Sequence, residues 1–259
     1  STIIGDSIKR IMKYLDFDII ADNHVGDWGT QFGKLIVGYD NWLDKDAYSN
    51  DPIEELERIY VLFSEKAGED PSLEDLAREE LKKLQQGDER NLALWKEFID
   101  ISIKEYNKVY ERLDVHFDLY NGESFYNSLM PQVLNDLKEK GLAIEDQEAL
   151  VVFFDEETKL NPCIVQKKDG SFLYSTSDLA TLKYKGEVLN IRKAVYVTDE
   201  RQQDHFRQVF KISELLGEPY NIEKAHVWFG IMKFGNGVIL SSRGGNIIRL
   251  VDLLDEAKA

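Results

Sequence analysis

Apolar residues at helical spacing open the chain, and short apolar runs alternate with helical stretches in its second half. A first helix is predicted by five apolar residues that recur every three or four positions: Ile4, Ile8, Ile11, Met12 and Leu15. The short apolar run over residues 17–21 predicts a buried strand, and residues 32–42 return to a helical pattern. This order predicts a strand, a loop and a helix.

The pattern is helical throughout residues 52–113. Within it, residues 71–87 are rich in Glu and Lys around regularly spaced leucines, which predicts an amphipathic surface helix with a solvated charged face. We read this block as a helical insertion.

Short strand-like runs appear from residue 142 onward, at 150–154, 163–166, 193–197 and 227–231. Helical stretches over 177–189 and 203–216 separate them. The resulting β-α-β-α order predicts a parallel sheet. The predicted fold class is therefore an α/β sheet interrupted by a helical insertion.

The composition narrows the function classes. The 259 residues carry a formal net charge of −16 with a pI near 4.7, a balance opposite to that of a free-standing nucleic-acid binder. The single cysteine, Cys163, excludes an intrachain disulfide framework, and no uncharged apolar run is long enough to cross a membrane. We expect a cytoplasmic protein with no membrane partner.

Both ends of the sequence break off inside helical patterns. The chain opens at Ser1 directly into the first amphipathic run, and the pattern around residues 249–257 has no Gly, Asn or Pro stop signal. We expect an excised fragment, either an expression fragment or a natural truncation.

Several common enzyme signatures are absent from the sequence. There is no Walker A loop, GxGxxG, GxSxG or HExxH motif, and the four histidines lie far apart from one another and from the lone cysteine. We therefore expect no dedicated metal site.

Three segments offer weaker leads. The first, Asn23 to Gly33, places three glycines among polar and aromatic groups at the end of a predicted strand, where open α/β sheets bind ligands. A tight turn with glycines at positive φ and Trp28 packed on the core explains the same residues equally well.

The second lead is the segment Tyr174 to Asp178. Its i, i+4 spacing puts a phenol beside a carboxylate, a pair suited to a planar guanidinium. Thr176 or Ser177 could also cap the following helix, and from spacing alone helix capping by Asp178 is favoured two to one over ligand binding, as a rough prior.

The third lead is the segment Ile239 to Asn246, with adjacent serines, an arginine and two glycines. Hydroxyls, backbone amides and Arg243 together suit a phosphate, and a surface turn is the alternative.

At this point the residues resemble the catalytic domain of the arginyl-tRNA synthetases, class I aminoacyl-tRNA synthetases. The similarity runs nearly from end to end. It rests on blocks that occur in the family's order: Ser1–Asp6, Asn23–Gly33, Phe117–Asp118, Gly122–Ser124, Tyr174–Asp178, Gln202–Phe206 and Phe229–Met232. The eleven-residue block Asn23–Gly33 is the most specific of these. The implied fold is a Rossmann-like parallel sheet, incomplete at its N-terminal side.

The resemblance implies roles for individual residues. Tyr174 and Asp178 would bind the guanidinium of arginine, with Gln202 or Gln203 completing that pocket. The residues expected near ATP are Glu200 and His205 at the ribose and Phe229, Gly230 and Met232 at the adenine. The loop expected in place of the class I KMSKS signature contains Ser241, Ser242 and Arg243. Residues expected along the active-site floor, without an assigned role, are Asn23, Gly26, Asp27, Trp28, Gly29 and Gln31.

The implied reaction has two steps. The carboxylate of arginine attacks the α-phosphate of ATP to give arginyl-adenylate and pyrophosphate, and a ribose hydroxyl of tRNA(Arg) then takes the arginyl group. The nucleophile arrives ionised, so the first step needs positioning and charge stabilisation rather than a protein general base. Mg²⁺ would enter bound to the phosphates of ATP. The family also implies that amino-acid activation depends on tRNA.

Departures from the family pattern limit what this chain would do alone. The HIGH signature is absent upstream of Ser1, and Ile239 and Ser242 stand where the KMSKS signature has lysines. Gly244 replaces a basic residue common in the family. Most tRNA contacts would belong to absent domains, so we expect the isolated fragment to be inactive. A non-catalytic truncated paralogue acting as a binding module, or a class I synthetase of another specificity, remains as an alternative.

The expected organisation has four parts. Residues 1–48 would form the first part of the catalytic core, 49–113 the helical insertion, 114–160 a connecting segment and 161–259 the second half of the core.

Overall fold

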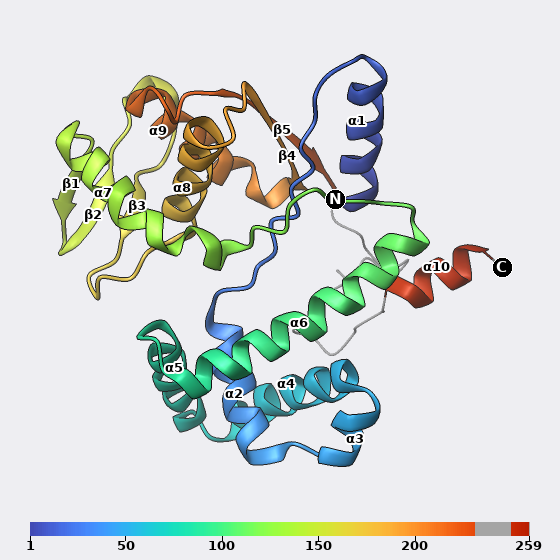
Figure 1. The fold of residues 1–259 in the computed structure, drawn as a ribbon. Helices are drawn as coiled ribbons and strands as arrows, with labels where there is room; N and C mark the ends of the chain where they lie inside the picture. The colour runs from blue at the N-terminus through green and yellow to red at the C-terminus, as the bar shows by residue number, and fades with distance from the viewer. Residues whose placement is uncertain (231–249, 259) are drawn as a thin grey trace. The chain divides into compact units, whose positions relative to one another are not determined.

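The chain forms two compact units, and each is described by itself. The computed structural model describes residues 1–230 and 250–258. The described part of the first unit comprises residues 1–24 and 119–230, and that of the second comprises 25–118 and 250–258. The first unit contains the described strands, whereas the second is helical (Figure 1).

The second unit is helical, and its two longest helices each begin at a capping aspartate. Asp51 and Asp88 accept hydrogen bonds from backbone amides at the starts of α4 and α6, as N-cap carboxylates do. Its helices are α2 (Thr30–Trp42), α3 (Lys45–Asn50), α4 (Pro52–Glu69), α5 (Ser72–Gln85), α6 (Glu89–Arg112) and α10 (Leu250–Lys258). The predicted helices over 32–42, 52–113 and 71–87 are thereby confirmed.

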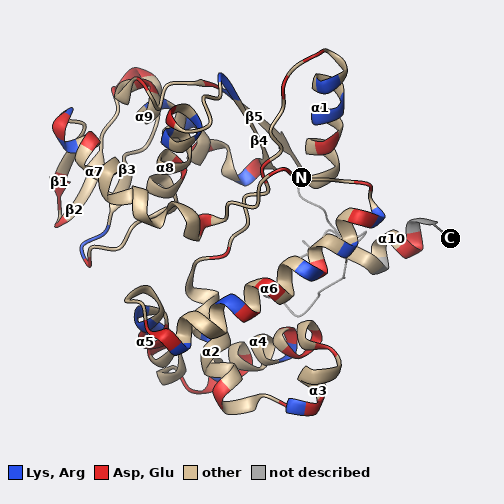
Figure 2. Cartoon of the chain, viewed as in Figure 1, with Lys and Arg blue, Asp and Glu red and all other residues tan. Residues whose placement is uncertain are grey.

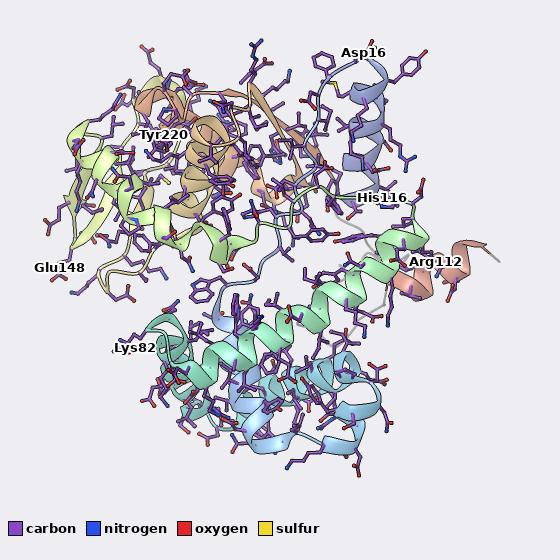
Figure 3. All side chains as sticks on the ribbon, in the orientation of Figure 1. Asp16, Lys82, Arg112, His116, Glu148 and Tyr220 are labelled. Atoms are coloured by element: carbon purple, nitrogen blue, oxygen red, sulfur yellow. The ribbon has the colours of Figure 1, made fainter. Side chains whose placement is uncertain are left out.

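The core of the second unit lies between α2 and the helices that pack on it. Ile36 of α2, Ile59 of α4 and Leu84 of α5 are completely buried there. Gly33 allows α2 and α5 to approach closely, because a Cβ atom at this position would lie 2.1 Å from the carbonyl oxygen of Ala77. Arg112 at the end of α6 forms an ion pair with Asp255 of α10 at 2.7 Å (Figure 3).

The first unit combines helices with two sheets. Its elements are α1 (Thr2–Tyr14), η1 (Glu123–Leu129), α7 (Met130–Glu139), β1 (Ala143–Asp146), β2 (Ala149–Val152), η2 (Glu156–Thr158), β3 (Cys163–Gln166), α8 (Tyr174–Glu187), β4 (Lys193–Asp199), η3 (Glu200–Gln202), α9 (Gln203–Leu216) and β5 (Glu223–Phe229). The predicted first helix and the helices over 177–189 and 203–216 are confirmed, although α8 begins three residues earlier than expected.

The predicted parallel sheet is confirmed for two of the strands. β4 and β5 pair in parallel, from Lys193 opposite Glu223 to Asp199 opposite Phe229, and α9 connects them. The expectation was wrong for the two earlier strand-like runs. They form β2 and β3, which pair antiparallel, and β1 completes that sheet in the order β1-β2-β3. The link from β2 to β3 contains no crossover helix, which a parallel pair would require.

The core of the first unit lies between α7, α8, α9 and the strands. Val133, Leu137, Leu179, Leu182 and Ile212 are completely buried in it. A cluster of hydrogen-bonded polar side chains beside this core joins α7 to α8 and to the loop before β5, where Tyr220 lies (Figure 3). The hydroxyl of Tyr220 donates to Asp136 at 2.5 Å, and the ammonium of Lys183 donates to the same carboxylate oxygen at 2.9 Å.

The predicted strand over residues 17–21 is wrong. Residues 17–21 belong to no strand, and the pairing at their end is one parallel bridge between Asp22 and Leu119. The amide of Asn23 donates to the carbonyl of Leu119 at 2.9 Å, and the amide of Leu119 donates to Ala21 at 3.1 Å. We call this pairing the neck, because the chain leaves the first unit after residue 24 and re-enters it at residue 119.

Acidic and basic residues are interspersed along the surface helices. Lys and Arg alternate with Asp and Glu along α6 (Figure 2), and ions of both signs pair within α1, where Arg10 lies 2.6 Å from Asp6. Such mixing fits solvated helix faces. Among the helices of the described residues, none combines the length and apolar character needed to span a bilayer.

Candidate functional site

The carboxyl ends of β4 and β5 bring several predicted site residues to one edge. The parallel register sets Asp199 opposite Phe229, so the residues that follow the two strands emerge side by side. Glu200 and Gln202 follow β4 in η3, and Gln203 begins α9. Ligands of open α/β sheets bind at such an edge. Gly230 follows β5 here, and a Cβ atom at that position would have no atom of the described residues within 4 Å.

An ion pair that the sequence analysis missed marks the end of β4. The carboxylate of Asp199 accepts from the backbone amide of Arg201 at 2.8 Å and from its guanidinium at 2.7 Å. The hydrogen bonds from Arg201 hold the pKa of Asp199 below its ordinary value. The Asp-x-Arg spacing around Glu200 could have indicated this contact in the sequence, because an Asp before a short helix commonly caps it.

The start of α8 is held in place by hydroxyl groups that donate hydrogen bonds to backbone carbonyls of the preceding strand, β3. The hydroxyl of Ser175 donates to the carbonyl of Ile164 at 2.9 Å, and that of Thr176 donates to Val165 at 2.5 Å. Both hydroxyl-bearing residues are buried. These bonds tie the helix end that carries Tyr174 to the three-stranded sheet.

The favoured explanation of Asp178 as a helix cap is wrong. Leu173 is the N-cap of α8 and makes no side-chain capping bond, so Asp178 lies in the second turn, beyond the unpaired amides. Thr176 and Ser177 do not cap either, since their hydroxyls donate to carbonyl groups. Tyr174 is 63% exposed at the first helical position.

Asp178 is paired across to α9. Its Oδ2 lies 2.6 Å from Nε2 of His205, and the two side chains are only 16% and 28% exposed. His205 was expected at the ATP ribose and Asp178 at the arginine guanidinium. The structure brings these two residues together.

Lys185 and Asp22 form a mostly buried charged pair beside Tyr196. The ammonium of Lys185, on α8, lies 3.5 Å from the carboxylate of Asp22 and 4.9 Å from the ring centre of Tyr196. Burial and then the negative charge of Asp178 raise the pKa of Tyr196 well above its ordinary value. In the described part of the chain, the buried hydroxyl of Tyr196 makes no hydrogen bond.

A second histidine lies on the sheet beside this group. His226 of β5 shares a 2.7 Å hydrogen bond with the hydroxyl of Thr198 on β4, and its ring lies 4.6 Å from that of Phe206. Burial and then the charge of His205 lower the pKa of His226. The pattern of apolar and polar residues in these strands gave no reason to single out Thr198 or His226 from the sequence.

The segment expected on the active-site floor divides between the units. Asn23 lies at the neck of the first unit, whereas Gly26, Asp27, Trp28, Gly29 and Gln31 belong to the second.

In the second unit this segment is a turn that leads into α2. Trp28 meets Trp95 edge to face at 5.6 Å, and the indole of Trp95 donates to the carbonyl of Asp27 at 2.7 Å. Gln31 donates to the carbonyl of Gly26 at 3.3 Å. The packing of Trp28 on the core agrees with the tight-turn explanation, but Gly29 and Gly33 do not have the positive φ which that explanation required.

Four predicted site residues fall outside the described residues: Met232, Ser241, Ser242 and Arg243. The helix pattern near the C-terminus is confirmed by α10. Within residues 1–230 and 250–258, no group of three or more His, Cys, Asp or Glu side chains could hold a metal ion.

Comparison with known proteins places this site in context. The family model described as "tRNA synthetases class I (R), catalytic domain" matches residues 1–259. The chain is 63% identical over 257 residues to an arginine–tRNA ligase of Fusobacterium nucleatum and 49% identical over 257 residues to one of Clostridium beijerinckii. In both cases the match covers 99% of this chain and 45% of the relative, so the chain spans less than half of their length.

Solved structures agree on the fold. The chain matches the crystal structure of arginyl-tRNA synthetase from Plasmodium falciparum with a TM-score of 0.76 and 30% identity, over 99% of this chain and 41% of that one. It matches Thermus thermophilus arginyl-tRNA synthetase with a TM-score of 0.73 and 18% identity, over 99% and 48%. The second match concerns the fold alone.

Proposed function

The chain belongs to the family of class I tRNA synthetase (R) catalytic domains, and from this premise we propose that it serves as the catalytic domain of an arginine–tRNA ligase. The reaction would join arginine to tRNA(Arg) at the expense of ATP. The observation that carries this proposal is the carboxylate of Asp178, four residues after Tyr174 on α8 and beside the carboxyl edge of the parallel strands.

Asp178 suits a guanidinium for two reasons. A carboxylate matches the planar donors of arginine, and its low exposure reduces screening by solvent. Tyr174 lies four residues earlier on the same helix face, where its ring can cover the cation. Gln202 or Gln203, at the nearby start of α9, would complete the pocket with amide groups.

The nucleotide would lie along the same sheet edge. We propose Glu200 for the ribose and Phe229, Gly230 and Met232 for the adenine, with the open backbone at Gly230 admitting a flat base. The ionised carboxylate of arginine would attack the α-phosphate directly, which requires alignment rather than a protein base. Ser241, Ser242 and Arg243 would stabilise phosphate charge. Mg²⁺ would arrive on the ATP phosphates and supply further charge neutralisation.

The remaining assignments complete the proposal. Residues 1–48 and 161–259 would make up the catalytic core, 49–113 a helical insertion and 114–160 a connecting segment. The floor residues Asn23, Gly26, Asp27, Trp28, Gly29 and Gln31 would border the reacting groups. We also propose that the protein is cytoplasmic.

We also infer that the 259-residue chain alone does not charge tRNA, because its relatives named arginine–tRNA ligase are more than twice as long.

Aminoacylation by the full-length gene product tests the proposal. We expect it to charge tRNA(Arg) with arginine and not with lysine, and we expect Asp178→Asn to lower kcat/KM for arginine by roughly tenfold to hundredfold, since a charge-assisted hydrogen bond is lost. Asp204→Asn is the matched control, because Asp204 lies on α9 with its side chain 81% exposed. Wild-type charging with another amino acid would refute the proposed specificity.

A further inference from the structure

The pairing of Asp178 with His205 fixes which atoms donate and accept. An ionised carboxylate can only accept hydrogen bonds, so Nε2 of His205 must carry the proton that points at Oδ2 of Asp178. At 2.6 Å the bond is short, as bonds to charged acceptors are. The N–H group at Nε2 of His205 is therefore used in the hydrogen bond to the carboxylate.

The other carboxylate oxygen stays available. Among the residues that the structure describes, none donates a hydrogen bond to Oδ1 of Asp178, whereas Oδ2 accepts from His205. The imidazole thus holds one oxygen and leaves the second for a cation. It also fixes the orientation of the carboxylate, because a side chain held by a hydrogen bond cannot change rotamer without losing that bond.

The ring of His205 is itself held by its neighbours. It meets the ring of Phe206 at 5.3 Å, and Phe206 is buried and packs against His226 of β5. The group that supports Asp178 therefore rests on the parallel sheet through aromatic packing. Such support is what keeps a binding group close to its productive geometry.

We propose that His205 is a positioning residue for the arginine side of the site, holding the Asp178 carboxylate for the guanidinium instead of contacting the ATP ribose. This inference rests on the proposed function. It replaces the role expected for His205 from the sequence with one that the 2.6 Å contact supports.

Two substitutions of His205 test whether Asp178 needs a hydrogen-bond donor at the position of Nε2 or only a polar side chain nearby. The amide nitrogen of glutamine can reach the place of Nε2, whereas that of asparagine reaches only the place of Nδ1. His205→Asn should therefore release Asp178, and His205→Gln should retain the bond. Arg207→Gln is the control on the same helix, since Arg207 is 57% exposed and bonds Asp204.

Steady-state aminoacylation by the full-length gene product gives the readout. For His205→Asn we expect KM for arginine to rise roughly tenfold to hundredfold, with KM for ATP and kcat within about twofold of wild type. His205→Gln should restore most of the arginine KM, and Arg207→Gln should match wild type. A general disturbance of the fold would instead change kcat and both KM values, and glutamine would not rescue it.

The opposing outcomes are distinct. A rise in KM for ATP without one for arginine would return His205 to the nucleotide site and overturn the inference, as would an unchanged arginine KM in His205→Asn. Equal effects of asparagine and glutamine would also overturn it. If wild type fails to charge arginine at all, the proposed function itself fails, a result that no His205 variant can mimic.

Discussion

Gly33 sits where α2 and α5 touch, and replacing it with alanine tests how closely the second unit is packed. The added Cβ would lie 2.1 Å from the carbonyl oxygen of Ala77 and 3.2 Å from Cβ of Leu81. The first contact is with backbone, which cannot swing aside as a flexible side chain would. Since favourable heavy-atom separations are about 3.5–4.0 Å, the two helices would have to separate by roughly 1 Å or more.

The cost follows from two opposing effects. Alanine is favoured over glycine within a helix by about 1 kcal/mol. Against this, overpacking costs about 1–3 kcal/mol, and here it also loosens the contacts of Ile36 and Leu84, both completely buried. We expect Gly33→Ala to lower the free energy of unfolding of the second unit by up to about 2 kcal/mol, the net of these two magnitudes.

Urea denaturation followed by tryptophan fluorescence measures this change. Three of the four tryptophans, Trp28, Trp42 and Trp95, lie in the second unit, so the signal reports mainly on its unfolding. Gly68→Ala on α4 is the matched control, because a Cβ atom there would have no atom of the described chain within 4 Å. The control should gain about 0.5–1 kcal/mol. A Gly33→Ala protein as stable as the control would refute the packing argument.

Three further predictions concern the first unit. Burial raises the pKa of Asp136, but hydrogen bonds from Tyr220 and Lys183 outweigh it and hold the value below 3.8. The stabilisation is therefore complete above about pH 4 and lost as pH falls through the folded-state pKa. In urea titrations, Asp136→Asn should be about 1–3 kcal/mol less stable than wild type at pH 7, and a gap that fails to narrow below pH 4 would contradict this. Tyr196→Phe should leave the free energy of unfolding within about 1 kcal/mol of wild type or raise it, because the buried hydroxyl has no hydrogen-bond partner in the described chain; calorimetry showing a larger loss would disprove this. Burial raises the pKa of Cys163, so its thiol should react with Ellman's reagent far more slowly in native protein than in urea, and equal rates would exclude a buried thiol.

The helices were predictable because their signals are local. Apolar spacing located α1, α2 and α9, and the acidic caps of α4 and α6 are visible in the sequence as Asp51 and Asp88. The resemblance to arginyl-tRNA synthetases is confirmed by the family match over the whole chain. Neither result required knowing which segments meet in space.

The strands were harder, since pairing depends on partners distant in sequence. Residues 17–21 have the apolar character of a strand but no described partner, apart from the bridge that follows at Asp22. β1 escaped notice because its hairpin to β2 turns on Gln147 and Glu148, both at positive φ, without the glycine or asparagine that usually marks such a turn. Antiparallel pairing of β2 with β3 is likewise not encoded in apolar runs.

The candidate site was only partly accessible from the sequence. Motif order identified Asp178 and His205 as separate members of an arginine set and an ATP set. Their contact depends on how α8 and α9 pack, which no spacing along the chain reports. The same holds for Lys185, which meets Asp22 from a distant segment.

The neck also dictates an order of events on the ribosome. Residues 21–23 find their partner, Leu119, only after residues 25–118 have been synthesised. At about 5–20 residues per second, that wait lasts roughly 5–20 s. Helical bundles with local contacts fold in microseconds to milliseconds. The helices α2 to α6 can therefore fold while residues 21–23 still lack their pairing partner. During that interval Ile8 and Met12 of α1, which are half-buried in the folded chain, are still uncovered and are natural targets for chaperones that guard nascent chains.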